Sequence, residues 1–216
     1  MQITHIGHAC LFVEAGDARV LIDPGAFSHG FEELRDLDAI FITHSHWDHI
    51  DSERLPVLLE ANSGALVYAE GETAAQVRDT GQEVTVLHPG DAVTVKGLTV
   101  TGVGGDHAVI HPDMPAMTNV GLVLSGGGEP TLYHPGDALA PVPEGVDVLA
   151  LPVVAPWASL RESVDFGRAV KAALTFPIHD ALLAEPGRQV FHGMAGQLLG
   201  DATQWRVLQG EGPVKV

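Results

Sequence analysis

Short apolar runs, bounded by glycine, proline and aspartate, recur along nearly the whole chain and restrict what it can fold into. Their lengths and their content of valine, isoleucine and threonine are typical of β-strands. We therefore predict a chain built mainly from strands, at positions 3–6, 10–13, 18–22, 39–43, 65–69, 84–87, 93–95, 98–103, 120–124, 131–134, 146–151, 173–178 and 205–208.

Helical signals are fewer than strand signals. Ser159 and Glu162 have the spacing of a capping box, which predicts a helix that runs to about Ala172. Apolar residues recur at helical spacing around 191–198 and predict a second helix. Weaker patterns predict two further helices, near 53–62 and 73–79.

The order of these elements predicts a layered α/β domain that spans residues 1–216 as one unit. A chain of 216 residues, 45% of them hydrophobic, can bury a large core, which excludes wholesale disorder. Gly126, Gly127 and Gly128 lie between two predicted strands. Because no helix start follows these glycines, they predict a hairpin turn and not a phosphate-binding loop.

Charge and cysteine content exclude several classes of function. The 28 acidic residues stand against 11 Lys and Arg, a formal net charge of -17. Nucleic acids and anionic membranes bind basic surfaces, so neither is expected as a partner. The single cysteine, Cys10, excludes an internal disulfide and a cysteine-based metal site. Without a long apolar run or a basic N-terminal leader, a cytoplasmic protein is expected, and the sequence leaves a homo-oligomer possible.

Histidines are unusually frequent, with 12 against 11 Lys and Arg, and several fall in one segment. His44, His46, Asp48 and His49 directly follow the apolar run 39–42. On an extended backbone His44 and His46 point to the same side, and the other two follow after the chain turns. Such a group is costly to bury unless it is hydrogen bonded or coordinated. Since imidazole and carboxylate suit zinc, iron or manganese, we predict a metal site in place of an ordinary polar loop.

The pattern His44-x-His46-x-Asp48-His49 resembles the signature of the metallo-β-lactamase-fold metallohydrolases. The opening segment 5–9 (His-Ile-Gly-His-Ala) and the pair Asp23-Pro24 resemble the branch of ascorbate-6-phosphate lactonase-like proteins and uncharacterised metal-dependent hydrolases. This resemblance implies an α/β fold, a four-layer αββα sandwich, with the metals at one edge between the two sheets.

The resemblance also implies two divalent cations, with Zn²⁺ expected and Mn²⁺ or Fe²⁺ as alternatives. The third imidazole of the first site is assigned to His107, because it follows a predicted strand end and a Gly104-Gly105 turn. His111 is a competing candidate for that position. The implied ligands are His44, His46 and His107 for one metal, Asp48, His49 and His179 for the other, and Asp137 as the bridge.

Several other residues are assigned weaker roles. Asp23 either orients a metal-binding histidine or starts an Asp-Pro turn, and Trp47 either covers the site or anchors its loop in the core. His134 is predicted to be a partly buried structural residue, and surface positions are predicted for His29, His88 and His192. Contacts with metal ligands or with substrate are expected for His8, Asp23, Trp47, His111 and, in the segment 152–157, Trp157.

These ligands imply hydrolysis as the reaction. Divalent cations lower the pKa of a bound water from about 15.7 to about 7, so a hydroxide shared by two of them can attack a carbonyl carbon or a phosphorus atom. Asp48 is the expected catalytic residue, as metal ligand and base. We expect a small-molecule substrate with an ester-like bond: a lactone, thioester, phosphodiester or cyclic phosphate. The alternatives are an iron-dependent redox enzyme of the same fold and a non-catalytic metal-binding module.

Overall fold

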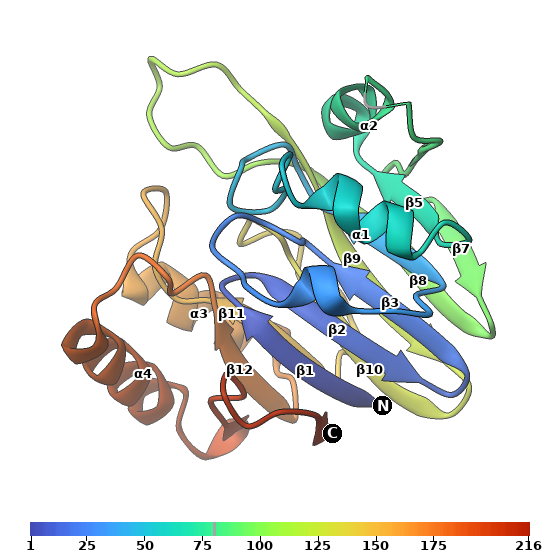
Figure 1. Cartoon of the computed structure of the whole chain (residues 1–216). Coiled ribbons are helices and arrows are strands. Elements are labelled where there is room, and N and C mark those ends of the chain that lie inside the picture. The colour runs from blue at the N-terminus through green and yellow to red at the C-terminus, as the bar shows by residue number, and fades with distance from the viewer. Residues whose placement is uncertain (80) are drawn as a thin grey trace.

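The strands form two mixed sheets in the computed structural model, which describes residues 1–79 and 81–216 (Figure 1). Each sheet has seven strands within the described residues. The first sheet has the order β14 (Val214–Lys215), β1 (Gln2–Gly7), β2 (Cys10–Ala15), β3 (Ala18–Ile22), β4 (Ala39–Ile42), β5 (Leu66–Ala69) and β6 (Thr85–Val86).

The second sheet is formed by the later part of the chain. One half of this sheet is antiparallel and contains its two longest strands, and the other half is parallel. Its order is β13 (Gln204–Trp205), β12 (Leu174–Ile178), β11 (Val148–Pro152), β10 (Glu129–His134), β9 (Thr118–Gly126), β8 (Leu98–Asp106) and β7 (Ala92–Val95).

Four α-helices and two short 3-10 helices complete the described part of the chain (Figure 1). None of the helices in this part is long and apolar enough to cross a membrane. The helices are η1 (Phe31–Glu33), α1 (Leu55–Ala61), α2 (Gly71–Arg78), α3 (Leu160–Val170), α4 (Glu185–Leu199) and η2 (Gly200–Ala202).

Three buried apolar clusters separate four layers. The largest cluster lies between the two sheets, and β4 shows how the strand pattern produces this arrangement. Successive side chains of a strand point to opposite faces, so Phe41 enters the core between the sheets while Ile40 packs with Leu58 of α1 on the other face. On the second sheet Leu149 likewise packs with Phe166 of α3. The expected αββα sandwich is confirmed.

The strand directions bring several loops to the same edge. Within the first sheet β1, β3 and β4 run in one direction, since β2 is antiparallel to β1 and to β3. Within the second sheet β8, β10 and β12 also share one direction. The segments that follow their carboxyl ends therefore lie at one end of each sheet. Those segments begin with or contain His8, Asp23, His44, His107, Asp137 and His179.

Most predicted elements are present, with local corrections. The helix from Ser159 has its capping box, with the Glu162 carboxylate accepting from the Ser159 backbone N–H at 2.8 Å. Gly126–Gly128 form the predicted hairpin between β9 and β10. The predicted turn at Gly104-Gly105 is wrong, because β8 continues through both glycines to Asp106 and pairs with β9. The strand predicted at 205–208 is reduced to Gln204–Trp205.

Candidate metal centre

The loop that follows β4 is held by a buried carboxylate from the end of β3. Asp23 accepts hydrogen bonds from the Thr43 backbone N–H and from the Thr43 hydroxyl, both at 2.8 Å. Its second oxygen lies 2.7 Å from His49 Nδ1. The backbone turns at His46, whose carbonyl accepts from the N–H of His49 at 2.9 Å. The loop therefore presents its imidazoles from a fixed backbone.

Two groups of ligand-type side chains lie at this edge of the sandwich. One comprises His44, His46, His107 and Asp137, and the other His8, Asp48, His49 and His179. Within each group the ligand atoms lie within 4.8 Å of one another. The structure thus brings together all the residues that the sequence assigned as metal ligands, and it adds His8 to the second group.

Asp137 lies between the two groups. Its Oδ1 is 3.0 Å from His49 Nε2 and 3.2 Å from His179 Nε2. Its Oδ2 is 3.3 Å from His107 Nε2 and 3.7 Å from His44 Nε2. One carboxylate therefore faces imidazoles of both groups, which is the geometry a bridging ligand needs.

Four buried atoms in this centre face one another without a hydrogen bond of acceptable geometry: the Nε2 atoms of His49, His107 and His179, and Oδ1 of Asp137. Leaving buried polar atoms unpaired costs about 1–3 kcal/mol each. These atoms converge on one another, and together they form a nitrogen and oxygen donor set that suits a divalent cation. The residues present therefore fit the two-metal centre that the sequence predicted.

The remaining ring nitrogens fix the orientation of these imidazoles. His107 Nδ1 donates to the Ala108 carbonyl at 2.6 Å, and His179 Nδ1 donates to the Val154 carbonyl at 2.7 Å. A ring that donates through Nδ1 carries its lone pair on Nε2, the atom that faces Asp137. These two histidines are therefore prepared as ligands through Nε2.

Electrostatics favour neutral imidazoles at His44 and His46, but they favour a charged imidazole at His49 and a charged carboxylate at Asp137. Burial lowers the pKa of His44 well below its usual value, and burial also lowers the pKa of His46. Neutral imidazole is the form that binds a metal. Burial alone would raise the pKa of Asp137, but the surrounding imidazoles, His49 first, hold it well below its usual value. Burial alone would likewise lower the pKa of His49, but Asp137 and Asp23 raise it well above its usual value.

His111 does not reach either group. Its side chain is 63% exposed, and its Nδ1 lies 3.6 Å from the Asp113 carboxylate. His107, by contrast, is buried at the end of β8 and belongs to the first group. The loop between β8 and β9 thus places its first histidine, and not its second, at the centre.

His8, Trp47 and Trp157 surround the ligands. His8 is fully buried, and its Nε2 lies 3.1 Å from Asp48 Oδ2. The Trp157 indole N–H donates to Asp137 Oδ2 at 2.9 Å. Trp47 is 64% exposed and packs edge-on against the Phe27 ring, so it lies at the rim and does not anchor the loop in the core.

The other histidines follow their predictions in part. His134 is fully buried, with Nε2 donating to the Ala9 carbonyl at 2.8 Å. His29 and His88 are exposed, as predicted. The surface prediction for His192 is wrong, because its side chain is only 13% exposed and lies 3.1 Å from the buried Asp180 carboxylate.

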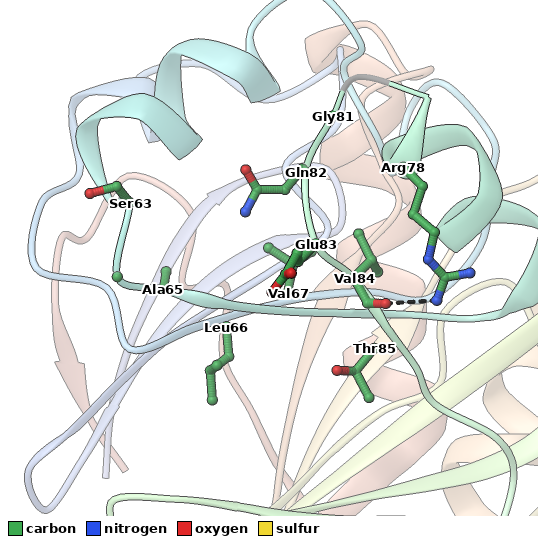
Figure 2. Close-up of a pocket in the computed structure, with 11 residues that line it drawn as sticks. Ser63, Ala65, Leu66, Val67, Arg78, Gly81, Gln82, Glu83, Val84 and Thr85 are labelled. Atoms are coloured by element: carbon green, nitrogen blue, oxygen red, sulfur yellow. Dashed lines mark hydrogen bonds between the residues drawn. The ribbon is translucent and has the colours of Figure 1, made fainter.

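A small cavity opens directly onto the centre. Its volume is about 210 Å³, and its walls include His46, Asp48, Asp137 and His179. A larger cavity of about 850 Å³ lies beside β5 and β6, where Arg78 donates to the Val84 carbonyl at 2.7 Å (Figure 2). Glu83 is the sole acidic residue among its described lining residues, which include no histidine or cysteine. The candidate metal ligands therefore line the smaller cavity and not the larger one.

Comparison with known proteins identifies the family to which the chain belongs. The model of the β-lactamase superfamily domain matches residues 2–179, a range that contains both ligand groups. The chain belongs to the metallo-β-lactamase superfamily. Both ligand groups of this superfamily member thus fall inside the matched range, while α4, β13 and β14 lie beyond it.

Individual relatives of this superfamily member cover most of its length. It is 47% identical over 215 residues to Protein Rv0786c of Mycobacterium tuberculosis, with 99% of each chain covered. It is 30% identical over 198 residues to a UPF0173 metal-dependent hydrolase of Alkaliphilus metalliredigens, covering 83% of this chain and 85% of the relative. The metallo-β-lactamase fold protein YhfI of Bacillus subtilis shares its fold, with a TM-score of 0.72, 18% identity, and 96% and 95% of the two chains covered.

Two residues at this centre escaped the sequence analysis. Asn119 accepts from the Asp137 backbone N–H at 3.0 Å and donates to the Pro135 carbonyl at 2.9 Å, so it fixes the turn that carries Asp137. Gly25 lies against the Asp48 backbone, where a Cβ atom would come within 1.7 Å of the carbonyl oxygen. Neither position carries a local signal, because each is defined by a neighbour distant in sequence.

Proposed function

We propose that this protein is a metal-dependent hydrolase in which two divalent cations are held by the two ligand groups and share Asp137. The proposal rests on the four buried atoms that converge around that carboxylate. The name of the Alkaliphilus relative, a metal-dependent hydrolase, supports it. The ligands of one cation are His44, His46 and His107, and those of the other are Asp48, His49 and His179.

Side chains of the protein orient the groups that take part in the reaction. Divalent cations bound here would supply a hydroxide nucleophile, because they lower the pKa of a coordinated water to about 7. Asp48 lines the cavity and lies 3.6 Å from His179 Nε2, so its carboxylate can both ligate and receive a proton from the attacking water. His8 donates to that carboxylate and orients it. Trp157 does the same for Asp137.

The reaction is hydrolysis of an ester-like bond in a small molecule: a lactone, thioester, phosphodiester or cyclic phosphate. A cavity of about 210 Å³ supports a small substrate, since pockets for drug-sized ligands measure roughly 300–1,000 Å³. We expect zinc as the metal because imidazole and carboxylate ligands suit it. Manganese and iron also bind such ligands and are the alternatives.

Metal analysis of wild type and His46→Ala tests the proposal. Wild type loaded with excess zinc or manganese should retain two metals per chain. The variant loses one ligand of the first cation, so its hydrolysis of generic lactone, thioester and phosphodiester substrates should fall at least about 100-fold, roughly 3 kcal/mol in transition-state stabilisation. His88→Ala, at an exposed histidine, is the control and should behave as wild type.

Failure of the wild type to bind metal, or equal turnover by His46→Ala, would exclude the proposal. Tightly bound, coloured iron without any hydrolysis would favour the iron-dependent redox alternative instead.

Asp23→Asn should weaken metal binding while the fold is kept. Asp23 orients His49 through Nδ1 at 2.7 Å, and loss of such an outer partner typically lowers metal affinity 10–100-fold. Competition with a chromophoric chelator measures the affinity of each site. Asp17→Asn, an exposed aspartate in the turn between β2 and β3, should leave both affinities unchanged, and an unchanged affinity in Asp23→Asn would contradict the predicted role.

A further inference from the structure

Apart from the ligand-type side chains, the cavity at the metal centre has walls that are aromatic or aliphatic. Within the described residues no lysine or arginine lines this cavity. The indole N–H of Trp157 is already engaged with Asp137, so it offers no free donor to a ligand. The residues that face the body of a substrate are Phe27, Trp47, Ile110, Pro156, Trp157 and Leu182.

The mouth of the cavity is also apolar. Trp47 is 64% exposed and Leu182 is 52% exposed, although both are large hydrophobic residues. Trp47 is held in place by the Phe27 ring, with 4.6 Å between ring centroids. Covering such side chains with an apolar group is favourable, because it removes apolar surface from water. The rim therefore gains most from a substrate whose own body is apolar.

Binding of a substrate with a charged substituent would be unfavourable in this cavity. It would lose hydration on entering the cavity and find no side chain of opposite charge beyond the metal ligands, and burial of an unpaired charge is strongly unfavourable. An anionic substituent would in addition approach a protein with a formal net charge of -17.

We propose that the site hydrolyses small acyl compounds, lactones or thioesters, whose remaining part is uncharged and apolar. This inference rests on the proposed hydrolase function. The oxygen of one water bonds to the acyl carbon, and the bond from that carbon to the ring oxygen or the thiol sulfur breaks. The leaving atom takes one proton, and the new carboxylic acid releases the other to solvent.

The test compares two ligands with the same metal-binding head. Butyrohydroxamic acid ends in a methyl group, and the monohydroxamate of succinic acid ends in a carboxylate at the same position. Calorimetry on zinc-loaded protein should give at least about tenfold tighter binding of the butyryl compound. Equal or tighter binding of the succinyl compound overturns the inference, and so does failure of the zinc-loaded protein to bind either one.

Leu182→Lys places a cation at the exposed rim and should shift the ratio of the two affinities at least about fivefold toward the succinyl compound. Val190→Lys, at an exposed apolar residue of α4 outside the cavity, is the matched control and should keep the wild-type ratio. If the ratio of the two affinities is unchanged in Leu182→Lys, ligands do not pass Leu182, and this result also overturns the inference.

Turnover gives an independent readout. After the uncatalysed rates are subtracted, zinc-loaded protein should hydrolyse 4-nitrophenyl butyrate faster than the mono-4-nitrophenyl ester of succinic acid, which has the same leaving group, and the reverse order overturns the inference. Metal content and the His46→Ala variant report separately on the hydrolase function. A protein that binds two metals and prefers the succinyl ester would keep the proposed function and lose only the proposed substrate class.

Discussion

Asp137→Asn should remove most of the bound metal and most of the hydrolysis together. The Asp137 carboxylate faces His49 and His179 with one oxygen and His107 and His44 with the other. Asparagine keeps the shape but offers one oxygen and an N–H₂ donor, which repels a cation. We expect metal content to fall from two to below one per chain and kcat/KM to fall at least about 1,000-fold, roughly 4 kcal/mol.

Elemental analysis and steady-state kinetics with the best generic substrate measure this effect, and circular dichroism checks that the sandwich is folded. Asp113→Asn is the matched control, because Asp113 lies in the loop after His107 with a side chain that is 91% exposed. Two metals per chain and wild-type turnover in Asp137→Asn would show that the carboxylate is not shared between cations.

Gly25→Ala should displace the ligand loop, although Gly25 itself binds nothing. An added Cβ would lie 1.7 Å from the Asp48 carbonyl oxygen and 2.5 Å from the His49 backbone nitrogen. Both are backbone atoms that cannot move aside as a flexible side chain would. Overpacking of a tight site typically costs 1–3 kcal/mol. We expect the free energy of unfolding to fall by about 3 kcal/mol and both metals to bind at least about tenfold more weakly.

Urea denaturation and metal titration measure these two effects of Gly25→Ala. Gly64→Ala adds the same methyl group where no atom lies within 4 Å, so it should leave both quantities unchanged. Wild-type stability and metal affinity in Gly25→Ala would mean that the loop after β4 adapts freely, contrary to the close packing described above.

The sandwich could be predicted because its information is local. Most strands are marked in the sequence by a short run of β-branched and apolar residues. In β4, successive side chains enter different apolar clusters, because they point to opposite faces of the sheet. The sequence predicts β13 too long and gives no signal for β14, because a strand of two residues is defined by its pairing with the neighbouring strand. Spacing predicted the helix at 191–198 but not its buried face, because Met194 and Leu198 are exposed.

The residues of the candidate site also differ in how far the sequence predicts them. Spacing alone predicts that His44 and His46 lie together, since they leave one strand together. His107 and Asp137 come from separate strands, and only the family resemblance connected them to that loop. Gly25 and Asn119 could not be found by either route, because their roles depend on backbone atoms reached through the fold.

The candidate ligands come from both sheets. The loop after β4 belongs to the first sheet, and the segments after β8, β10 and β12 belong to the second. Cations held between them would cross-link the two halves of the sandwich, and a species that binds only the native state stabilises it by mass action, about 2.7 kcal/mol at 100 times the dissociation constant. The supply of metal would thus govern how long the native chain persists as well as how fast it turns over substrate.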